Sequence, residues 1–167
     1  MRRLSILAGL ALLAACGNAD AAPDTAQSVA LSAITPDQAL PTVVVYKTAT
    51  CGCCSGWVDH MRSAGFTVDA RDLPDNVELM RVKVDAGVPG PMTTCHTSLI
   101  DGYVVEGHVP ADQVKRLLAE RPDVAGIAVP GMPVGSPGME GAGARPYQVH
   151  SWDRQGRTAV FAEVDPR

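Results

Sequence analysis

Three cysteines lie within four positions of the sequence, in the stretch KTATCGCCSGW. Cys51, Cys53 and Cys54 follow a run of β-branched residues and precede a pattern of helical spacing. The start of a helix offers free backbone N–H groups and the positive end of the helix dipole, and both lower the pKa of a thiol and favour the thiolate. Such thiolates can form a redox pair, bind a soft metal or join in disulfides, and this stretch alone leaves all three open.

The residues around the three cysteines favour copper among the soft metals. Sulfur ligands select Cu(I), Zn(II) or iron–sulfur clusters. Gly52 permits the backbone turn that lets Cys51 and Cys53 point to the same side. The thioether of Met92 favours copper over zinc, and the imidazole of His96 is a ligand for Cu(II) as well as Cu(I). A site with both kinds of donor can hold either oxidation state.

The elements around the cysteines follow the order βαβαββα. Runs of β-branched residues predict strands, apolar residues at helical spacing predict helices, and Asp101-Gly102 favours a tight hairpin turn. The predicted elements are a strand at 42–47, a helix at 55–65, a strand at 66–73, a helix at 75–87, a hairpin at 97–107 and a helix at 110–121.

This order, with two cysteines three positions apart between the first strand and the first helix, resembles the thioredoxin and glutaredoxin fold. The resemblance covers about residues 42–121 and implies a mixed α/β sheet flanked by helices. In that fold a cis-proline loop precedes the third strand and lies against the cysteine pair. Here the matching segment is Thr94-Cys95-His96. We therefore expect Cys95 to lie against the three cysteines although more than forty residues separate them in sequence.

Glycine and proline dominate the segment at 122–146, which contains six glycines and five prolines. This density predicts a loop without helix or strand. Met132 and Met139 lie in it beside glycine or proline, where their thioethers are candidate ligands as well as candidate core residues. Two β-rich runs around 153–156 predict a C-terminal hairpin.

Four motifs together resemble the CopG-type copper-resistance proteins, a family known as a domain of unknown function (DUF411) with a metal-binding label. They are TATCGCCSGW, TTCHT, IDGYVVEGHVP and VPGMPVGSPGME, within residues 48–140. The resemblance implies a periplasmic thioredoxin-like domain that binds copper and interconverts Cu(I) and Cu(II). The implied ligands are Cys51, Cys53, Cys54 and Cys95, with His96, Met92, Met132 and Met139 as weaker candidates. Because thiolates can bridge Cu(I) ions, we expect more than one copper per chain. Of the other histidines, His60 is interpreted as a solvated surface residue. His108 could cap or approach the loop methionines, and both His108 and His150 are interpreted as lying outside the site.

Two other functions remain open at this point. A thiol-disulfide oxidoreductase would use Cys51 and Cys54 as its exchange pair, but this leaves Cys53 and Cys95 unexplained. A copper carrier without redox activity would share every ligand with a copper oxidoreductase. In either copper-binding case the partners are copper ions and other periplasmic copper-handling proteins. Exported thiolates without metal drift to disulfides, either Cys51 with Cys54 or one of these with Cys95. A metal-free form with such a disulfide therefore remains compatible with a metal site.

The first 15 residues have two arginines, a short apolar run and small residues, which is typical of an export signal. Leu13-Ala14-Ala15-Cys16 resembles the lipobox of bacterial lipoproteins. We expect a lipoprotein-type signal peptide at 1–15, a lipidated Cys16, a flexible tether at 16–41 and the thioredoxin-like domain at 42–167. Gly17 favours the outer membrane. The alternative is cleavage after Ala21, which leaves the protein free in the periplasm.

The charge of the chain gives no sign of nucleic-acid binding. Removing residues 1–15 deletes Arg2 and Arg3 and no acidic residue, so the formal net charge moves from −4 to −6. An acidic domain without a basic patch is repelled by phosphate backbones. Contact with a membrane is expected only through the lipid on Cys16.

Lipidation of Cys16 has a direct test in cells. We expect radiolabelled palmitate to be incorporated into the full chain and lost in the Cys16→Ala variant, because the cysteine thiol is the attachment point. The measurement is fluorography of the immunoprecipitated protein. Label that persists in Cys16→Ala would contradict the lipoprotein prediction.

Overall fold

The computed structural model describes residues 39–167, so the predicted signal peptide, Cys16 and most of the predicted tether lie outside the described residues. Its elements are β1 (Val43–Thr48), α1 (Gly52–Ser63), β2 (Val68–Leu73), α2 (Asn76–Asp85), the short 3-10 helix η1 (Gly90–Met92), β3 (Thr97–Ile100), β4 (Tyr103–Gly107), α3 (Ala111–Glu120), β5 (Gly126–Val129), β6 (Tyr147–Trp152) and β7 (Thr158–Val164). None of the helices in this part of the chain has the length and apolar character needed to cross a bilayer.

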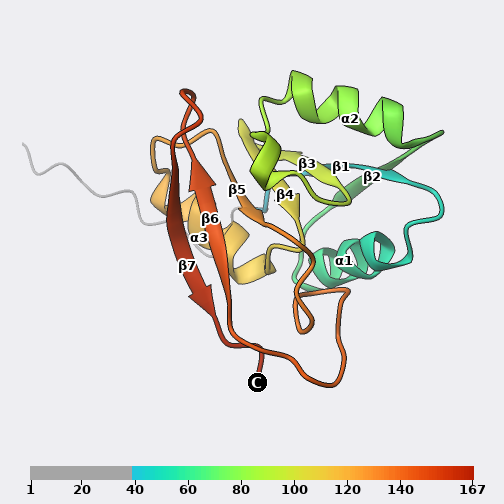
Figure 1. Cartoon of the computed structure of the whole chain (residues 1–167), viewed down its shortest axis with the longest axis vertical. Helices are drawn as coiled ribbons and strands as arrows, with labels where there is room; N and C mark the ends of the chain where they lie inside the picture. Colours follow the sequence, from blue (N-terminus) through green and yellow to red (C-terminus); the bar gives the residue numbers. More distant parts are fainter. Residues whose placement is uncertain (1–38) are drawn as a thin grey trace, which may run out of the picture. The chain divides into compact units, whose positions relative to one another are not determined.

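All seven strands form one mixed sheet in the order β2-β1-β3-β4-β5-β6-β7 (Figure 1). β1 pairs in parallel with β2 and antiparallel with β3, and β4 pairs in parallel with β5. The β3–β4 hairpin and the C-terminal β6–β7 hairpin are antiparallel. The predicted α/β class and the order up to α3 are confirmed.

Apolar side chains cover both faces of the sheet, because neighbouring residues of a strand point to opposite sides. Val105 of β4 lies in the larger core with Trp57 of α1 and Leu117 of α3. Val104 lies in a smaller core on the other face, together with Met92. The centre of the sheet is therefore buried on both sides, as in other α/β folds, whereas the edge strands β2 and β7 are largely exposed.

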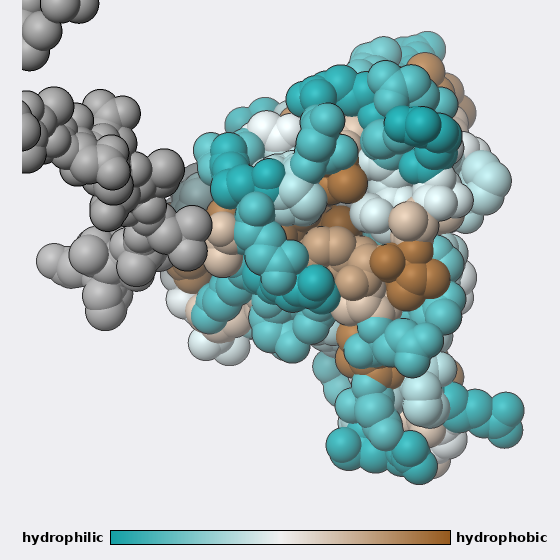
Figure 2. Space-filling view, turned by 90° about the vertical axis from the view of Figure 1, so that its left-hand side faces the viewer, coloured by the Kyte–Doolittle hydropathy of each residue, from teal (hydrophilic) through white to brown (hydrophobic). Residues whose placement is uncertain are grey.

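The outer strand β7 has only one neighbour, β6, and forms one edge of the sheet. Figure 2 views the molecule from the side that lies at the left of Figure 1, where apolar atoms appear between polar ones. Val160 of β7 is among the exposed large apolar residues.

One strand contradicts the prediction of an uninterrupted loop at 122–146. β5 (Gly126–Val129) is fully buried and pairs with both β4 and β6. Its first residue must be glycine, because a Cβ at Gly126 would collide with the carbonyl oxygen of Val104 and the ring of Trp152. The glycine that argued against a strand is thus required by the close approach of two neighbours.

The start of α1 differs from the prediction, and the start of α3 gives His60 a structural role. α1 begins at Gly52, earlier than the predicted Ser55, because the N–H of Ser55 already donates to the carbonyl oxygen of Cys51 at 3.2 Å. α3 begins as predicted next to Pro110, but its first free N–H, that of Ala111, donates to Nε2 of His60 at 3.0 Å. His60 is therefore a half-buried helix cap, which corrects its interpretation as a solvated surface residue, and burial lowers its pKa.

Candidate metal centre

The CxCC motif lies where β1 ends and α1 begins. Cys51 is the N-cap residue, and its N–H donates to the carbonyl oxygen of Thr48 at 3.1 Å, which closes a tight turn after the strand. Cys53 and Cys54 lie in the first turn of the helix. All three thiol groups are thus near the positive end of the helix dipole, as the sequence predicts.

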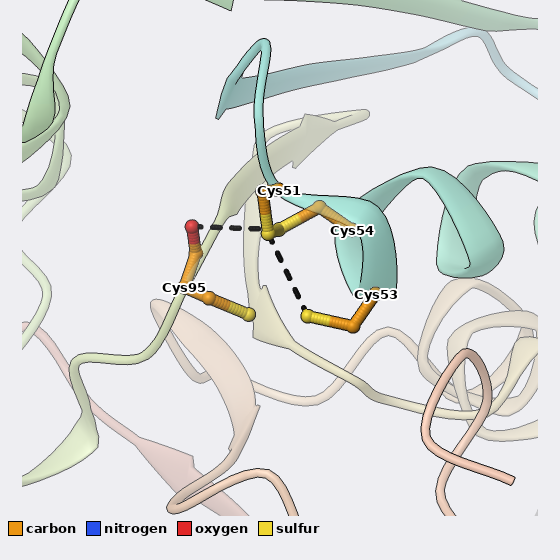
Figure 3. A group of neighbouring side chains, drawn as sticks. All are labelled: Cys51, Cys53, Cys54 and Cys95. Carbon is orange, nitrogen blue, oxygen red and sulfur yellow. Dashed lines mark hydrogen bonds between the residues drawn. A yellow bond between two sulfur atoms is a disulfide. The ribbon is translucent and has the colours of Figure 1, made fainter.

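Two of the four cysteines form a disulfide, Cys51–Cys54, while Cys53 and Cys95 are free (Figure 3). The Sγ atoms of Cys51 and Cys53 are 3.6 Å apart. The Sγ of Cys54 lies 3.7 Å from the carbonyl oxygen of Cys95. Because a disulfide sulfur carries no hydrogen, this last approach is a packing contact. The structure therefore shows the motif with one disulfide, next to two free thiols.

Cys95 reaches the motif from the segment before β3. The Sγ atoms of Cys51, Cys53, Cys54 and Cys95 all lie within 4.8 Å of one another (Figure 3). Cys51 and Cys53 are partly exposed, Cys54 is buried, and Cys95 is partly exposed. The expected convergence of two distant segments is present. The four sulfur atoms are close enough to bind a shared metal ion after small side-chain movements.

A second group shares Cys95 with two histidines. Nε2 of His108 lies 2.9 Å from the Sγ of Cys95, and Nδ1 of His96 lies 3.5 Å from it. Both imidazoles are buried, and their ring centroids are 5.0 Å apart. The ring of Trp57, which lies in the larger core, packs on His96 at a centroid distance of 4.7 Å.

A backbone carbonyl sets the tautomer of His108. Nδ1 of His108 lies 2.8 Å from the carbonyl oxygen of Pro137, and a carbonyl can only accept. Nδ1 therefore carries the hydrogen, and the lone pair of Nε2 faces the Sγ of Cys95. Burial lowers the pKa of His108, which keeps this imidazole neutral. A histidine oriented in this way by a carbonyl oxygen is prepared to donate its free nitrogen to a metal.

His96 is neutral for a related reason. Its side chain is fully buried, and burial followed by the nearby His108 holds its pKa well below the usual range. Nε2 of His96 has no hydrogen-bond partner among the described residues. Its other nitrogen is the one that faces Cys95.

The thiol of Cys95 is stabilised in its protonated form. Burial, followed by the nearby Cys53, raises the pKa of Cys95 to about 12. The neutral imidazole of His108 also favours the protonated thiol. Its Nε2 can accept a hydrogen bond from the S–H of Cys95, whereas a thiolate has no hydrogen to donate. Metal binding to this sulfur therefore has to displace a proton.

The loop between β5 and β6 lies directly on the motif. A Cβ at Gly56 of α1 would come within 3.0 Å of the Cα of Gly138. A Cβ at Gly138 would collide with the backbone of Cys53 and Trp57, and its positive φ of 81° also favours glycine. Two glycines thus let the loop approach the first turns of α1, and the same loop supplies the carbonyl oxygen that orients His108.

The three candidate methionines have different surroundings. Met92 is buried in the smaller core against Trp152 and its neighbours, which gives its side chain a packing role. Met132 is 41% exposed and has a positive φ, and Met139 is partly buried. Their roles as ligands stay predictions.

The sequence interpretation left His108 outside the site. Counting the strand pairing outward from the Asp101-Gly102 turn predicts that His108 lies opposite Cys95. The Asp101-Gly102 turn pairs Ile100 with Tyr103 and, farther along, Thr97 with Glu106. Two more residues along each strand bring Cys95 opposite His108. The N–H of Gly107 donates to the carbonyl oxygen of His96 at 3.0 Å, which shows that this register continues.

Comparisons with known proteins agree with this geometry. The family model "Protein of unknown function, DUF411" matches residues 92–139, which include Cys95, both histidines and the covering loop. The solved structure "Copper resistance protein copG- Form 2" is 44% identical, with a TM-score of 0.69, and the match covers 75% of this chain and 98% of that one. The chain belongs to the CopG family. "Form 1" gives 45% identity, a TM-score of 0.68 and the same coverage. No curated protein matches the chain.

Membership of the CopG family confirms the resemblance of the four sequence motifs and the predicted thioredoxin-like α/β architecture. The match to the CopG structures extends over three quarters of the chain, whereas the family model begins only after the CxCC motif.

The raised pKa of Cys95 predicts a shifted pH profile of alkylation. Because only the thiolate reacts, we expect the iodoacetamide reaction of Cys95 in the folded, metal-free chain to keep accelerating up to about pH 12. Peptide mass spectrometry at a series of pH values measures it. Cys95 in the denatured chain is the matched control and should follow an ordinary thiol. A folded-state rate that levels off near the ordinary value of 9.0 would contradict the prediction.

Proposed function

We propose that this chain is a copper-binding protein of copper resistance and that Cys51, Cys53, Cys54 and Cys95 hold Cu(I). The observation that carries the proposal is the set of four sulfur atoms within 4.8 Å, in a chain whose relatives are named copper resistance proteins. Cu(I) is a soft ion and prefers thiolate ligands, and the clustered thiols match that preference.

Copper binding by all four cysteines requires the Cys51–Cys54 disulfide to be reduced. An external dithiol supplies two electrons and two protons, becomes a disulfide itself, and leaves two thiols in place of the Cys51–Cys54 S–S bond. In the oxidised form, Cys53 and Cys95 are the only free thiols of the motif. The affinity for Cu(I) is therefore expected to follow the redox state of the disulfide.

More than one Cu(I) ion per chain follows from charge balance. One Cu(I) among four thiolates leaves three negative charges without a counter-charge in a partly buried place, which is unfavourable. Each further Cu(I) that bridges two sulfur atoms offsets one of these charges. We propose a cluster of several Cu(I) ions bridged by the cysteines.

His108 and His96 extend the donor set on the side of Cys95. The free Nε2 of His108 is 2.9 Å from the Cys95 sulfur, so a copper ion bound to Cys95 has an imidazole beside it. Imidazole is a ligand for Cu(II) as well as Cu(I). We therefore propose that copper bound here changes between Cu(I) and Cu(II), with one electron passing to or from an external redox partner. Storage or transfer of copper without a change of oxidation state is the simpler alternative.

A thiol-disulfide oxidoreductase is the second candidate function. The Cys51–Cys54 disulfide lies where a helix follows a strand, which is the arrangement of a thioredoxin-type exchange pair. However, the Sγ of Cys53 lies 3.6 Å from the Sγ of Cys51, so a third thiol would compete in every exchange reaction.

We also propose that the protein acts in the periplasm, anchored by Cys16 to the outer membrane, where it exchanges copper with other copper-handling proteins. This rests on the sequence of residues 1–17, and the palmitate experiment described above tests the lipid anchor. The acidic domain gives it no expected nucleic-acid partner.

Copper counting separates these functions. We expect the reduced full chain, reconstituted anaerobically with Cu(I), to hold more than one copper per chain, and the oxidised chain to hold less. Serine variants of Cys51, Cys53, Cys54 or Cys95 should each lower the count, measured by atomic emission spectrometry. Cys16→Ser is the matched control and should leave it unchanged.

Two outcomes would count against the proposal. A strict single equivalent of copper would contradict a cluster. Absence of copper, together with insulin reductase activity that is lost in Cys51→Ser, would favour the oxidoreductase.

A further inference from the structure

The segment that carries Cys95 is held without a cis peptide bond, since none is present in residues 39–167. The thioredoxin fold uses a cis-proline at this place, as noted for the sequence. Here the segment from Thr94 to Thr97 has to keep Cys95 against α1 by other contacts. Besides the backbone hydrogen bonds of the hairpin, several of these contacts come from one buried carboxylate.

Glu106 of β4 binds the segment on both sides of Cys95. Its side chain is fully buried. Oε1 accepts from the N–H of Thr94 at 2.6 Å, and Oε2 accepts from the hydroxyl of Thr97 at 2.6 Å. One carboxylate thus fixes the residue before Cys95 and the residue after His96. Cys95 and His96 lie between these two anchors.

Lys83 of α2 neutralises this carboxylate. Nζ donates to Oε1 of Glu106 at 2.6 Å and to the hydroxyl of Thr97 at 2.8 Å. The side chain of Lys83 is only 3% exposed, and α2 contributes it to the sheet from the opposite side to α1 (Figure 1). Because a buried charge without a partner is very unfavourable, the lysine and the glutamate require each other.

The pairing of Glu106 with Thr97 also fixes the position of His108, the imidazole that faces the Cys95 sulfur. Glu106 pairs with Thr97 in the β3–β4 hairpin, and His108 follows two residues later. A side chain at Gly107 would collide with Thr94, so the hairpin end and the Cys95 segment are packed closely. A shift of the Thr94–Thr97 segment would therefore separate Cys95 from both Cys53 and His108.

We propose that Glu106 and Lys83 are positioning residues of the metal centre. They hold the Cys95 sulfur close enough to Cys53 and His108 for these side chains to bind the same metal ion. Neither residue touches the sulfur atoms; each acts through Thr94 and Thr97. This inference rests on the proposed function, because positioning of Cys95 serves metal binding only if the site binds copper. Its geometric part, the closeness of Cys53 and Cys95, is testable without copper.

An ordinary structural ion pair predicts a different result. If the pair served stability alone, replacing both charges by neutral residues of similar shape would restore a normal site once the protein folds. If the carboxylate positions Cys95, the neutral pair still fails when residue 106 is methionine, because a thioether does not replace the two oxygens that accept from the Thr94 N–H and the Thr97 hydroxyl. The double variant Lys83→Met/Glu106→Met distinguishes the two roles.

The probe is phenylarsine oxide, whose arsenic forms two As–S bonds with a close pair of thiols and releases water. It is added to the copper-free full chain in a Cys16→Ser background with the Cys51–Cys54 disulfide intact, so that Cys53 and Cys95 are the pair. We expect tight chelation in this parent chain and a severalfold weaker one in Glu106→Met and in the double variant. Glu78→Gln/Arg81→Met, which removes an exposed ion pair of the same helix, is the matched control.

Copper affinity and a conservative rescue complete the test. Replacing groups that orient metal ligands typically lowers metal affinity about 10- to 100-fold, and we expect this loss in the double variant by chelator competition for Cu(I). Thr97→Val should weaken arsenical chelation, whereas Thr97→Ser, which keeps the hydroxyl, should restore it. Thermal unfolding confirms that each variant is folded.

The outcomes keep the two proposals apart. Chelation at the parent level in a folded double variant, or in Thr97→Val, would overturn the positioning role. A parent chain that chelates the arsenical but binds no Cu(I) would refute the copper function and leave the positioning role supported.

Discussion

Four cysteine sulfur atoms within 4.8 Å cannot all carry negative charge unless cations lie between them. The structure avoids this repulsion in two ways. Cys51 and Cys54 share a disulfide, and Cys95 keeps its proton, which His108 accepts as a hydrogen bond. Copper would offer a third way, because each Cu(I) brings the missing positive charge. The electrons, protons and metal ions held by the site are therefore coupled, and a change in one changes the others.

The rest of the fold maintains this crowding. β1 and α1 present the CxCC motif, and the buried Glu106 carboxylate holds the segment that brings Cys95 to it. The loop between β5 and β6 covers the motif through the close approach of Gly56 and Gly138, and it orients His108 through Pro137. Each support comes from a different part of the sequence, so the site depends on the completed sheet.

Local patterns predicted much of this arrangement. The strand before the CxCC motif, the helix after it and the Asp101-Gly102 hairpin come from short-range periodicity and turn chemistry, and the thioredoxin-like order then brings Cys95 to the motif. β5 was missed because its need for Gly126 arises from contacts with Val104 and Trp152, which are distant in sequence. The Lys83–Glu106 pair was missed for the same reason, since nothing local distinguishes a buried charge from an exposed one.

X-ray absorption spectroscopy at the copper edge of the reduced, Cu(I)-loaded chain tests the central claim most directly. A cysteine-bridged cluster predicts a first shell dominated by sulfur and a copper–copper distance in the second shell. Cys95→Ser should lower the sulfur count and weaken the copper–copper signal, because the variant removes the sulfur that joins the two segments. A first shell of nitrogen and oxygen only, or a spectrum that Cys95→Ser leaves unchanged, would contradict a four-sulfur copper site.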